Sequence, residues 1–136
     1  MFDVFNELAT DLSLEDNGSW FDMGKGARVL VARSGNRAFS KALSKAVEAN
    51  KQVLDAEDEH ADLKSDELMI DVVARTLLLG WEGISFKGAP MTYSAANAKT
   101  LLAVKDFRAR VQGFANTFEA FKVKEELAQG NDSAAT

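Results

Sequence analysis

The fold of this chain is decided by a stretch that begins Leu77-Leu78-Leu79-Gly80-Trp81-Glu82-Gly83-Ile84. It continues with Lys87-Gly88-Ala89-Pro90 and then with Tyr93-Ser94-Ala95-Ala96-Asn97-Ala98. A glycine after an apolar periodic run is typical of a helix end, and a serine before an apolar segment is typical of a helix start. The order therefore predicts a helix ending at Gly80, a tight loop around Trp81, a short turn and a helix capped by Ser94.

A helix rich in aromatic residues is predicted over residues 104–121. Its apolar positions are spaced 3, 4, 3, 4 and 3 residues apart, which is typical of helices that pack nearly parallel to a neighbour. Such a stripe is usually core, but aromatic residues are also enriched in protein interfaces. This seam starts at Val104. We expect some of its apolar side chains not to be needed for the core of a monomer. The candidate partner or oligomer interface residues are Trp81, Phe107, Val111, Phe114, Phe118 and Phe121.

The N-terminal part of the chain alternates between helical and extended patterns. Apolar residues recur at three- and four-residue steps from Phe2 to Leu12, which predicts a short amphipathic helix ending near Ser13. Residues 20–23 and 27–33 flank Gly24-Lys25-Gly26 and predict a β-hairpin. The chain should therefore enter its helical part through a small extended element.

Two further helices are predicted before the deciding stretch. Asn36 has the side chain of a helix N-cap and should start a helix that reaches the mid-fifties. Ser65 is expected to cap the next helix, whose wide apolar arc over residues 68–79 predicts a central and heavily buried position. Residues 84–86 and 91–93 flank a turn and form either a second short hairpin or a wrapped loop.

These elements predict a mainly α protein. The expected architecture is a small helical domain over residues 1–128 with a short N-terminal β-hairpin and, in one of the two alternatives, a second short hairpin. Residues 129–136 are small and polar and are expected to form a disordered tail. At 136 residues with 46% hydrophobic residues, the chain is long enough for one domain with a real core.

Composition excludes several classes of function. The chain has no cysteine, which excludes disulfides, thiolate nucleophiles and cysteine-ligated metals. Its net charge of −5 makes nucleic-acid binding unfavourable as a main role. The N-terminus has neither the basic nor the apolar region of a signal peptide, and the apolar run around residues 72–81 is too short to cross a bilayer. We expect a soluble intracellular protein.

No motif carries catalytic chemistry. His60 is the one histidine and follows Glu57 by three residues, but a carboxylate-bridged metal site needs a second such pair. Gly24-x-Gly26 is followed by a strand instead of a helix and lacks the third glycine, so a dinucleotide site is excluded. Ser34 and Ser94 have no histidine base nearby in the sequence. We expect no enzyme activity and no catalytic, cofactor-binding or metal-binding residues.

The chain resembles the tail assembly chaperones of long-tailed, lambda-like bacteriophages over roughly residues 18–122. The resemblance begins with Gly18-x-Trp20, Val29, Ala32-Arg33 and Asn36. Its second part is Leu79-Gly80-Trp81-Glu82, the Gly88-x-Pro90 turn, and Tyr93-Ser94 ahead of Asn97-Ala98. Its third part is the aromatic segment with Phe107-Arg108 and Phe114-Ala115.

The resemblance implies a small, non-catalytic protein made in the host cytoplasm and absent from the mature virion. Such chaperones coat the tape measure protein, keep it soluble and help recruit tail tube subunits. Many are made in two lengths by a programmed frameshift, and the small polar tail is similar to that of the shorter form. The expected partners are the tape measure protein, the tail tube protein, a longer frameshifted form and further copies of the chain. No nucleic acid, membrane or cofactor is expected.

Two other readings of the sequence remain open. A tail-completion or connector-type structural protein would have similar bulk properties but would be retained in the virion. A small metal-dependent enzyme using Glu57 and His60 is the third alternative. A thermal melt that did not change with divalent metal or chelator would argue against the enzyme.

Overall fold

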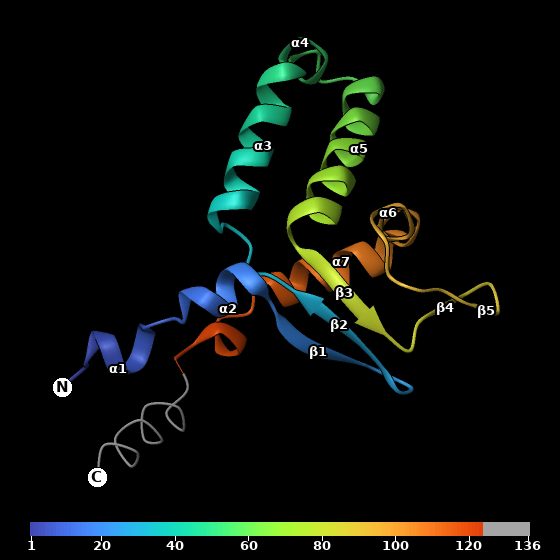
Figure 1. Ribbon diagram of the computed structural model, residues 1–136. Helices are drawn as coiled ribbons and strands as arrows, with labels where there is room; N and C mark the ends of the chain where they lie inside the picture. The colour runs from blue at the N-terminus through green and yellow to red at the C-terminus, as the bar shows by residue number, and fades with distance from the viewer. Residues whose placement is uncertain (124–136) are drawn as a thin grey trace.

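The protein combines a small antiparallel sheet with helices on one side and a projecting helical hairpin (Figure 1). The computed structural model describes residues 1–123 of the 136-residue chain, so the predicted polar tail lies outside the described residues. The elements in chain order are α1 (Val4–Leu8), α2 (Leu12–Asn17), β1 (Ser19–Gly24), β2 (Ala27–Val31), α3 (Arg37–Ala49), α4 (Lys51–Asp55), α5 (Glu59–Thr76), β3 (Leu78–Glu82), β4 (Ser85–Phe86), β5 (Ala89–Pro90), α6 (Ala95–Leu102), α7 (Lys105–Ala115) and the 3-10 helix η1 (Glu119–Phe121).

The prediction of a mainly α protein is wrong, because the fold is mixed α/β. Of the described residues, 56% are helical and 18% are in strands, and the strands form one three-stranded and one two-stranded antiparallel sheet. The strand missed by the prediction is β3, which follows α5 after a single residue and pairs with β2. A short apolar run such as Leu77-Leu78-Leu79 fits a buried helix or a buried strand equally well, so only its partner strand decides.

The β1–β2 hairpin is confirmed by the structure. The two strands pair with Phe21 opposite Val29, and the turn places Lys25 at φ 55° between two glycines that also have positive φ. Positive φ at consecutive turn residues matches the right-handed twist of the strands, which explains the glycine-rich connection. The sheet order is β1-β2-β3, so the hairpin supplies two of the three strands.

Helix α5 begins and ends at other residues than predicted. It starts at Glu59 because the Asp58 carboxylate accepts a hydrogen bond from the Ala61 amide at 2.9 Å, not at a cap formed by Ser65. It ends at Thr76, and Gly80 lies inside β3 opposite Leu30 instead of terminating the helix. The predicted helical arc therefore mixes the last turns of α5 with the first residues of β3.

Two helix caps were predicted correctly. Asn36 Oδ1 accepts a hydrogen bond from the Phe39 amide at 2.9 Å, and Ser94 Oγ accepts one from the Asn97 amide at 3.0 Å. The helix that begins at Asn36 is interrupted at Asn50, which separates α3 from α4. Between β3 and α6, the second hairpin is present as β4 and β5, joined by a turn with Lys87 and Gly88 at positive φ. Its second strand is Ala89–Pro90, which was predicted as part of the turn, and not residues 91–93.

The aromatic segment is not one helix. Helix α7 ends at Ala115, and residues 119–121 resume only as η1. The break changes the direction of the chain, so that two rings of the seam reach the same strand residue. Phe114 stacks on Phe21 with ring centroids 4.6 Å apart, and Phe121 lies against Phe21 at 6.1 Å. The continuous helix predicted over residues 104–121 is therefore wrong.

The N-terminal helix is also divided. Helix α1 ends at Leu8, and Thr10 forms an antiparallel bridge with Lys122 before α2 begins. Helix α2 extends to Asn17, beyond the predicted end near Ser13. The bridge between the two ends of the described chain interrupts the helical pattern, because an extended backbone cannot continue the helical hydrogen bonds.

The core lies where α5, α6 and α7 pack against one face of the sheet. By strand alternation, Phe21, Val29 and Trp81 lie on this face, while Trp20, Leu30 and Gly80 lie on the opposite one. The largest side chains with almost no exposed surface are Phe121, Leu77, Leu78, Leu102, Val29, Val31, Val72, Val73 and Val111. The opposite face of the sheet is the first candidate surface for function.

Candidate binding surfaces

Three of the six predicted interface residues lie in the core of the monomer. Val111 and Phe121 have no exposed surface, and Trp81 is 7% exposed. The Trp81 indole donates to the Met91 carbonyl at 2.7 Å, and its ring contacts Tyr93 edge-on at 5.0 Å. The partial burial of Tyr93 raises the pKa of its phenol. These contacts hold Trp81 in one orientation beneath the β4–β5 hairpin.

The other three predicted residues keep part of their surface exposed. Phe107 and Phe114 pack against the core cluster from its edge, and Phe118 is half-buried between α7 and η1. The Arg33 guanidinium lies 5.9 Å from the centre of the Phe118 ring, and the Arg110 guanidinium lies at the same distance from Phe114. The structure does not bring all six residues to one surface, and their role in a partner interface stays a prediction.

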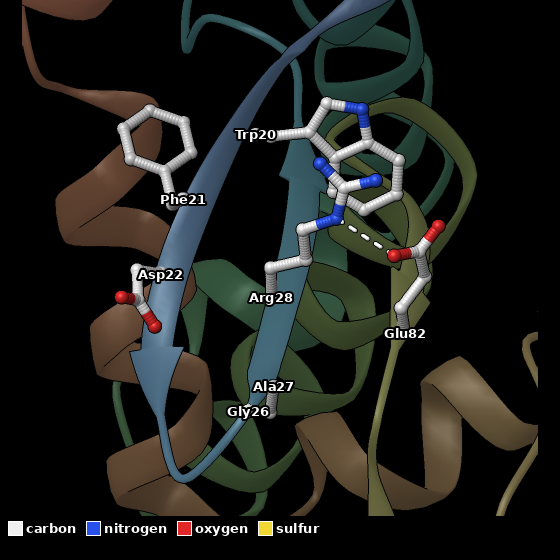
Figure 2. Close-up of a pocket in the computed structure, with 7 residues that line it drawn as sticks. All are labelled: Trp20, Phe21, Asp22, Gly26, Ala27, Arg28 and Glu82. Atoms are coloured by element: carbon white, nitrogen blue, oxygen red, sulfur yellow. Dashed lines mark hydrogen bonds and ion pairs between the residues drawn. The ribbon is translucent and has the colours of Figure 1, made fainter.

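The open face of the sheet carries an aromatic and ionic cluster that the interface prediction missed. Trp20, Arg28 and Glu82 extend from three neighbouring strands and lean toward one another, as Figure 2 shows. The Arg28 guanidinium lies 3.9 Å from the centre of the Trp20 ring, and its Nε donates to Glu82 Oε2 at 2.8 Å. The resulting pocket, which Asp22 also lines, has a volume of about 440 Å³.

The ion pair sets the electrostatics of this sheet face. The hydrogen bond from Arg28 is the main cause that lowers the pKa of the Glu82 carboxyl, and it raises the pKa of the Arg28 guanidinium. Both side chains are largely exposed, so the pair contributes little to stability. Its effect is to fix the direction of the Arg28 side chain, whose guanidinium lies over the Trp20 ring. In the sequence, the two-residue spacing of Trp20 and Asp22 within the predicted strand indicates that both side chains lie on the same face of the sheet.

The N-terminal arm, residues 1–12, exposes several large apolar side chains. Phe2, Val4, Phe5, Leu8 and Leu12 are between 52% and 72% exposed. Helix α1 has no buried residue and extends away from the sheet (Figure 1). Apolar side chains gathered in this way mark interaction sites more often than scattered ones do. The three- and four-residue spacing predicted the helix, but not that its apolar side would be left uncovered.

Chemical sites are not evident in the part of the chain that the structure describes. Within residues 1–123, no group of three or more histidine, aspartate or glutamate side chains is placed to hold a metal ion. His60 is exposed in the first turn of α5. Among the helices described, none is both long and apolar enough to cross a membrane. The sheet face exposes Trp20, and the N-terminal arm exposes five large apolar side chains.

A family model for the YdaY prophage proteins matches residues 34–131, which is most of the chain. The chain belongs to the YdaY prophage protein family. The matched region begins just before α3 and includes α5, β3 and the aromatic segment. No curated protein and no solved structure matches the chain. Membership of the YdaY family establishes a phage-derived protein, which agrees with the phage origin implied by the resemblance in the sequence.

Proposed function

We propose that this YdaY-family protein is a phage tail assembly chaperone that binds the tape measure protein. It keeps that protein soluble in the host cytoplasm, helps recruit tail tube subunits, and is not retained in the mature virion. The proposal is for a non-catalytic protein that acts in several copies, alongside a longer frameshifted form of itself. The phage origin of the family supports the setting.

The observation that carries this proposal is the uncovered apolar surface on an acidic chain. The N-terminal arm exposes five large apolar side chains, and the sheet face exposes Trp20 beside an ordered ion pair. A holder of a long helical partner needs apolar surface for binding and net charge for solubility. Many weak contacts along one extended partner would sum to tight binding through multivalency.

Co-expression with the tape measure protein encoded beside this chain tests the proposal. The tape measure protein should be soluble and co-purify with the wild-type chain. Trp20→Asp should abolish co-purification while the circular dichroism spectrum is retained, because Trp20 is 43% exposed on the sheet face. Phe118→Asp tests the predicted interface of the aromatic segment in the same way. Leu63→Asp is the matched control, since Leu63 is 63% exposed on α5, away from both candidate surfaces.

Each result of the co-expression experiment has a defined meaning. A tape measure protein that stays insoluble with both the short and the frameshifted long form contradicts the proposal. Unfolding of Phe118→Asp would place that ring in the monomer core instead of an interface. Mass spectrometry of purified virions gives the second test, because a tail-completion or connector-type protein would be present there and a chaperone would not.

A further inference from the structure

Two surfaces of opposite charge form no ion pair in the described chain, although Asp3 and Asp11 accept backbone hydrogen bonds as the caps of α1 and α2. The first is the N-terminal arm, in which Asp3, Glu7 and Asp11 alternate with the exposed apolar residues. Residues 1–17 contain no lysine, arginine or histidine. No ion pair within residues 1–123 involves any of these three carboxylates. The arm is therefore an apolar and acidic segment.

The second surface is the outer face of α3. Arg37, Lys41 and Lys45 follow one another at four-residue steps, which places them in one stripe along the helix. All three are exposed, and none takes part in an ion pair of the described chain. By helical geometry the exposed Ala38 and the half-buried Ala42 lie beside this stripe, and their small side chains let another chain approach closely there.

Helix α3 is only partly covered by the rest of the protein. It contacts α5 along the projecting hairpin, yet none of its residues is buried. An amphipathic helix normally buries its apolar stripe against a neighbour. On α3 the apolar residues Phe39 and Leu43 are half-buried, and Phe39 packs against the core cluster. The outer face with the cationic stripe is left exposed, which makes it the candidate acceptor for an apolar segment that carries negative charge.

The arm of the same copy is held away from this acceptor. The Asp11 amide donates to the Phe121 carbonyl at 2.8 Å, and the Val123 amide donates to the Ala9 carbonyl at 3.0 Å. These bonds fix the base of the arm at the end of the body where η1 lies. Figure 1 shows α1 pointing away from the α3–α5 hairpin. The complementary surface is therefore one on a second copy.

We propose that the N-terminal arm of one copy docks on the α3 face of a second copy. In this contact, Phe2, Phe5 and Leu8 of the arm pack over Ala38 and Ala42. The carboxylates of the arm form ion pairs with Arg37, Lys41 and Lys45. Because the two surfaces differ, the contact is heterologous and joins copies head to tail. Each copy then offers one arm and one acceptor, so the assembly is a ring or an open chain. This self-association goes beyond tape measure binding and needs no other protein.

The test measures the assembly state of the full chain, with any purification tag at the C-terminus. Sedimentation velocity should show wild-type species larger than a monomer that grow with concentration and shrink at high salt, which screens exposed charges. Phe5→Asp should weaken association by about tenfold or more, because it places a charge in the apolar contact. The double variant Lys41→Glu, Lys45→Glu should do the same, because it reverses the stripe.

Matched controls separate the docking surfaces from general effects. Leu63→Asp introduces a charge at an apolar residue as exposed as Phe5, and Lys87→Glu reverses a charge at the β4–β5 turn. Both controls should assemble as the wild type does. Circular dichroism and thermal unfolding should show that every variant keeps its fold, because Phe5, Lys41 and Lys45 are all exposed.

Mixing the two defective variants gives the decisive result. The Phe5→Asp copy retains its acceptor, and the copy with two α3 substitutions retains its arm. The mixture should therefore form a 1:1 dimer that cannot grow, at a concentration at which the wild type assembles and each variant alone is a monomer. A wild-type chain that stays monomeric, variants that still assemble, or a mixture that stays monomeric would each overturn the proposal.

Discussion

Replacing Phe121 with alanine separates the two roles that the sequence allowed for the aromatic segment. The Phe121 ring has no exposed surface and lies against Phe21 in the core. Removing a fully buried phenylalanine ring costs about 3–5 kcal/mol, of which roughly 1.5–3 kcal/mol is the transfer of apolar surface and the rest is the cavity. Given the chain length, this cost lowers the melting temperature by about 10–15 °C.

Urea denaturation followed by tryptophan fluorescence measures this loss directly, since Trp20 and Trp81 lie on opposite faces of the sheet that Phe121 supports. Phe118→Ala is the internal control, because Phe118 is only half-buried and should cost roughly half as much. A Phe121→Ala protein that loses less than about 1 kcal/mol but no longer binds its partner would refute the assignment of this ring to the core.

Three further substitutions test local features of the fold. Gly83→Ala should destabilise the protein by at least about 2 kcal/mol in urea, because Gly83 has φ 71° and an added Cβ would lie 2.6 Å from the Gly26 carbonyl oxygen. Asn36→Ala should cost about 1–2 kcal/mol by the same measurement, because it removes the cap of α3. The hydrogen bond with Lys99 is the main cause that lowers the pKa of the Asp71 carboxyl. The ionised carboxylate therefore contributes to the free energy of unfolding at neutral pH, and this contribution is lost as the pH falls below 3.8, the ordinary pKa of the group. Asp71→Asn should thus cost about 0.5–1 kcal/mol at pH 7, and acid denaturation curves of the two proteins should converge below that pH.

Features set by neighbouring residues could be predicted from the sequence. The caps at Asn36 and Ser94 depend on a side chain and an amide three residues later, so they form wherever the helix forms. The β1–β2 hairpin depends on alternating residues around a glycine-rich turn, which are also local. The family membership agrees with the phage origin that the resemblance implied, while the tail chaperone role stays a proposal.

The candidate surfaces could be predicted only in part. The apolar positions of the N-terminal arm were visible as a helical pattern, but a pattern does not say whether another element covers it. The aromatic residues of the seam were visible too, yet Phe121 is buried and Phe118 is half-buried because the chain bends between them. Burial depends on what packs against a residue, and that is decided by contacts distant in the sequence.

The sequence by itself determined the local elements, namely the first hairpin, the two capped helix starts and the acidic, cysteine-free character of the chain. Only the tertiary structure decided that Leu78–Glu82 is a strand, because its backbone pairs with Ala27–Val31 about fifty residues earlier. The same pairing makes the fold mixed α/β and places Trp81 in the core and Trp20 outside it. The hydrogen bonds between these distant strands decide which face of the sheet each residue lies on. An apolar run alone cannot specify that face.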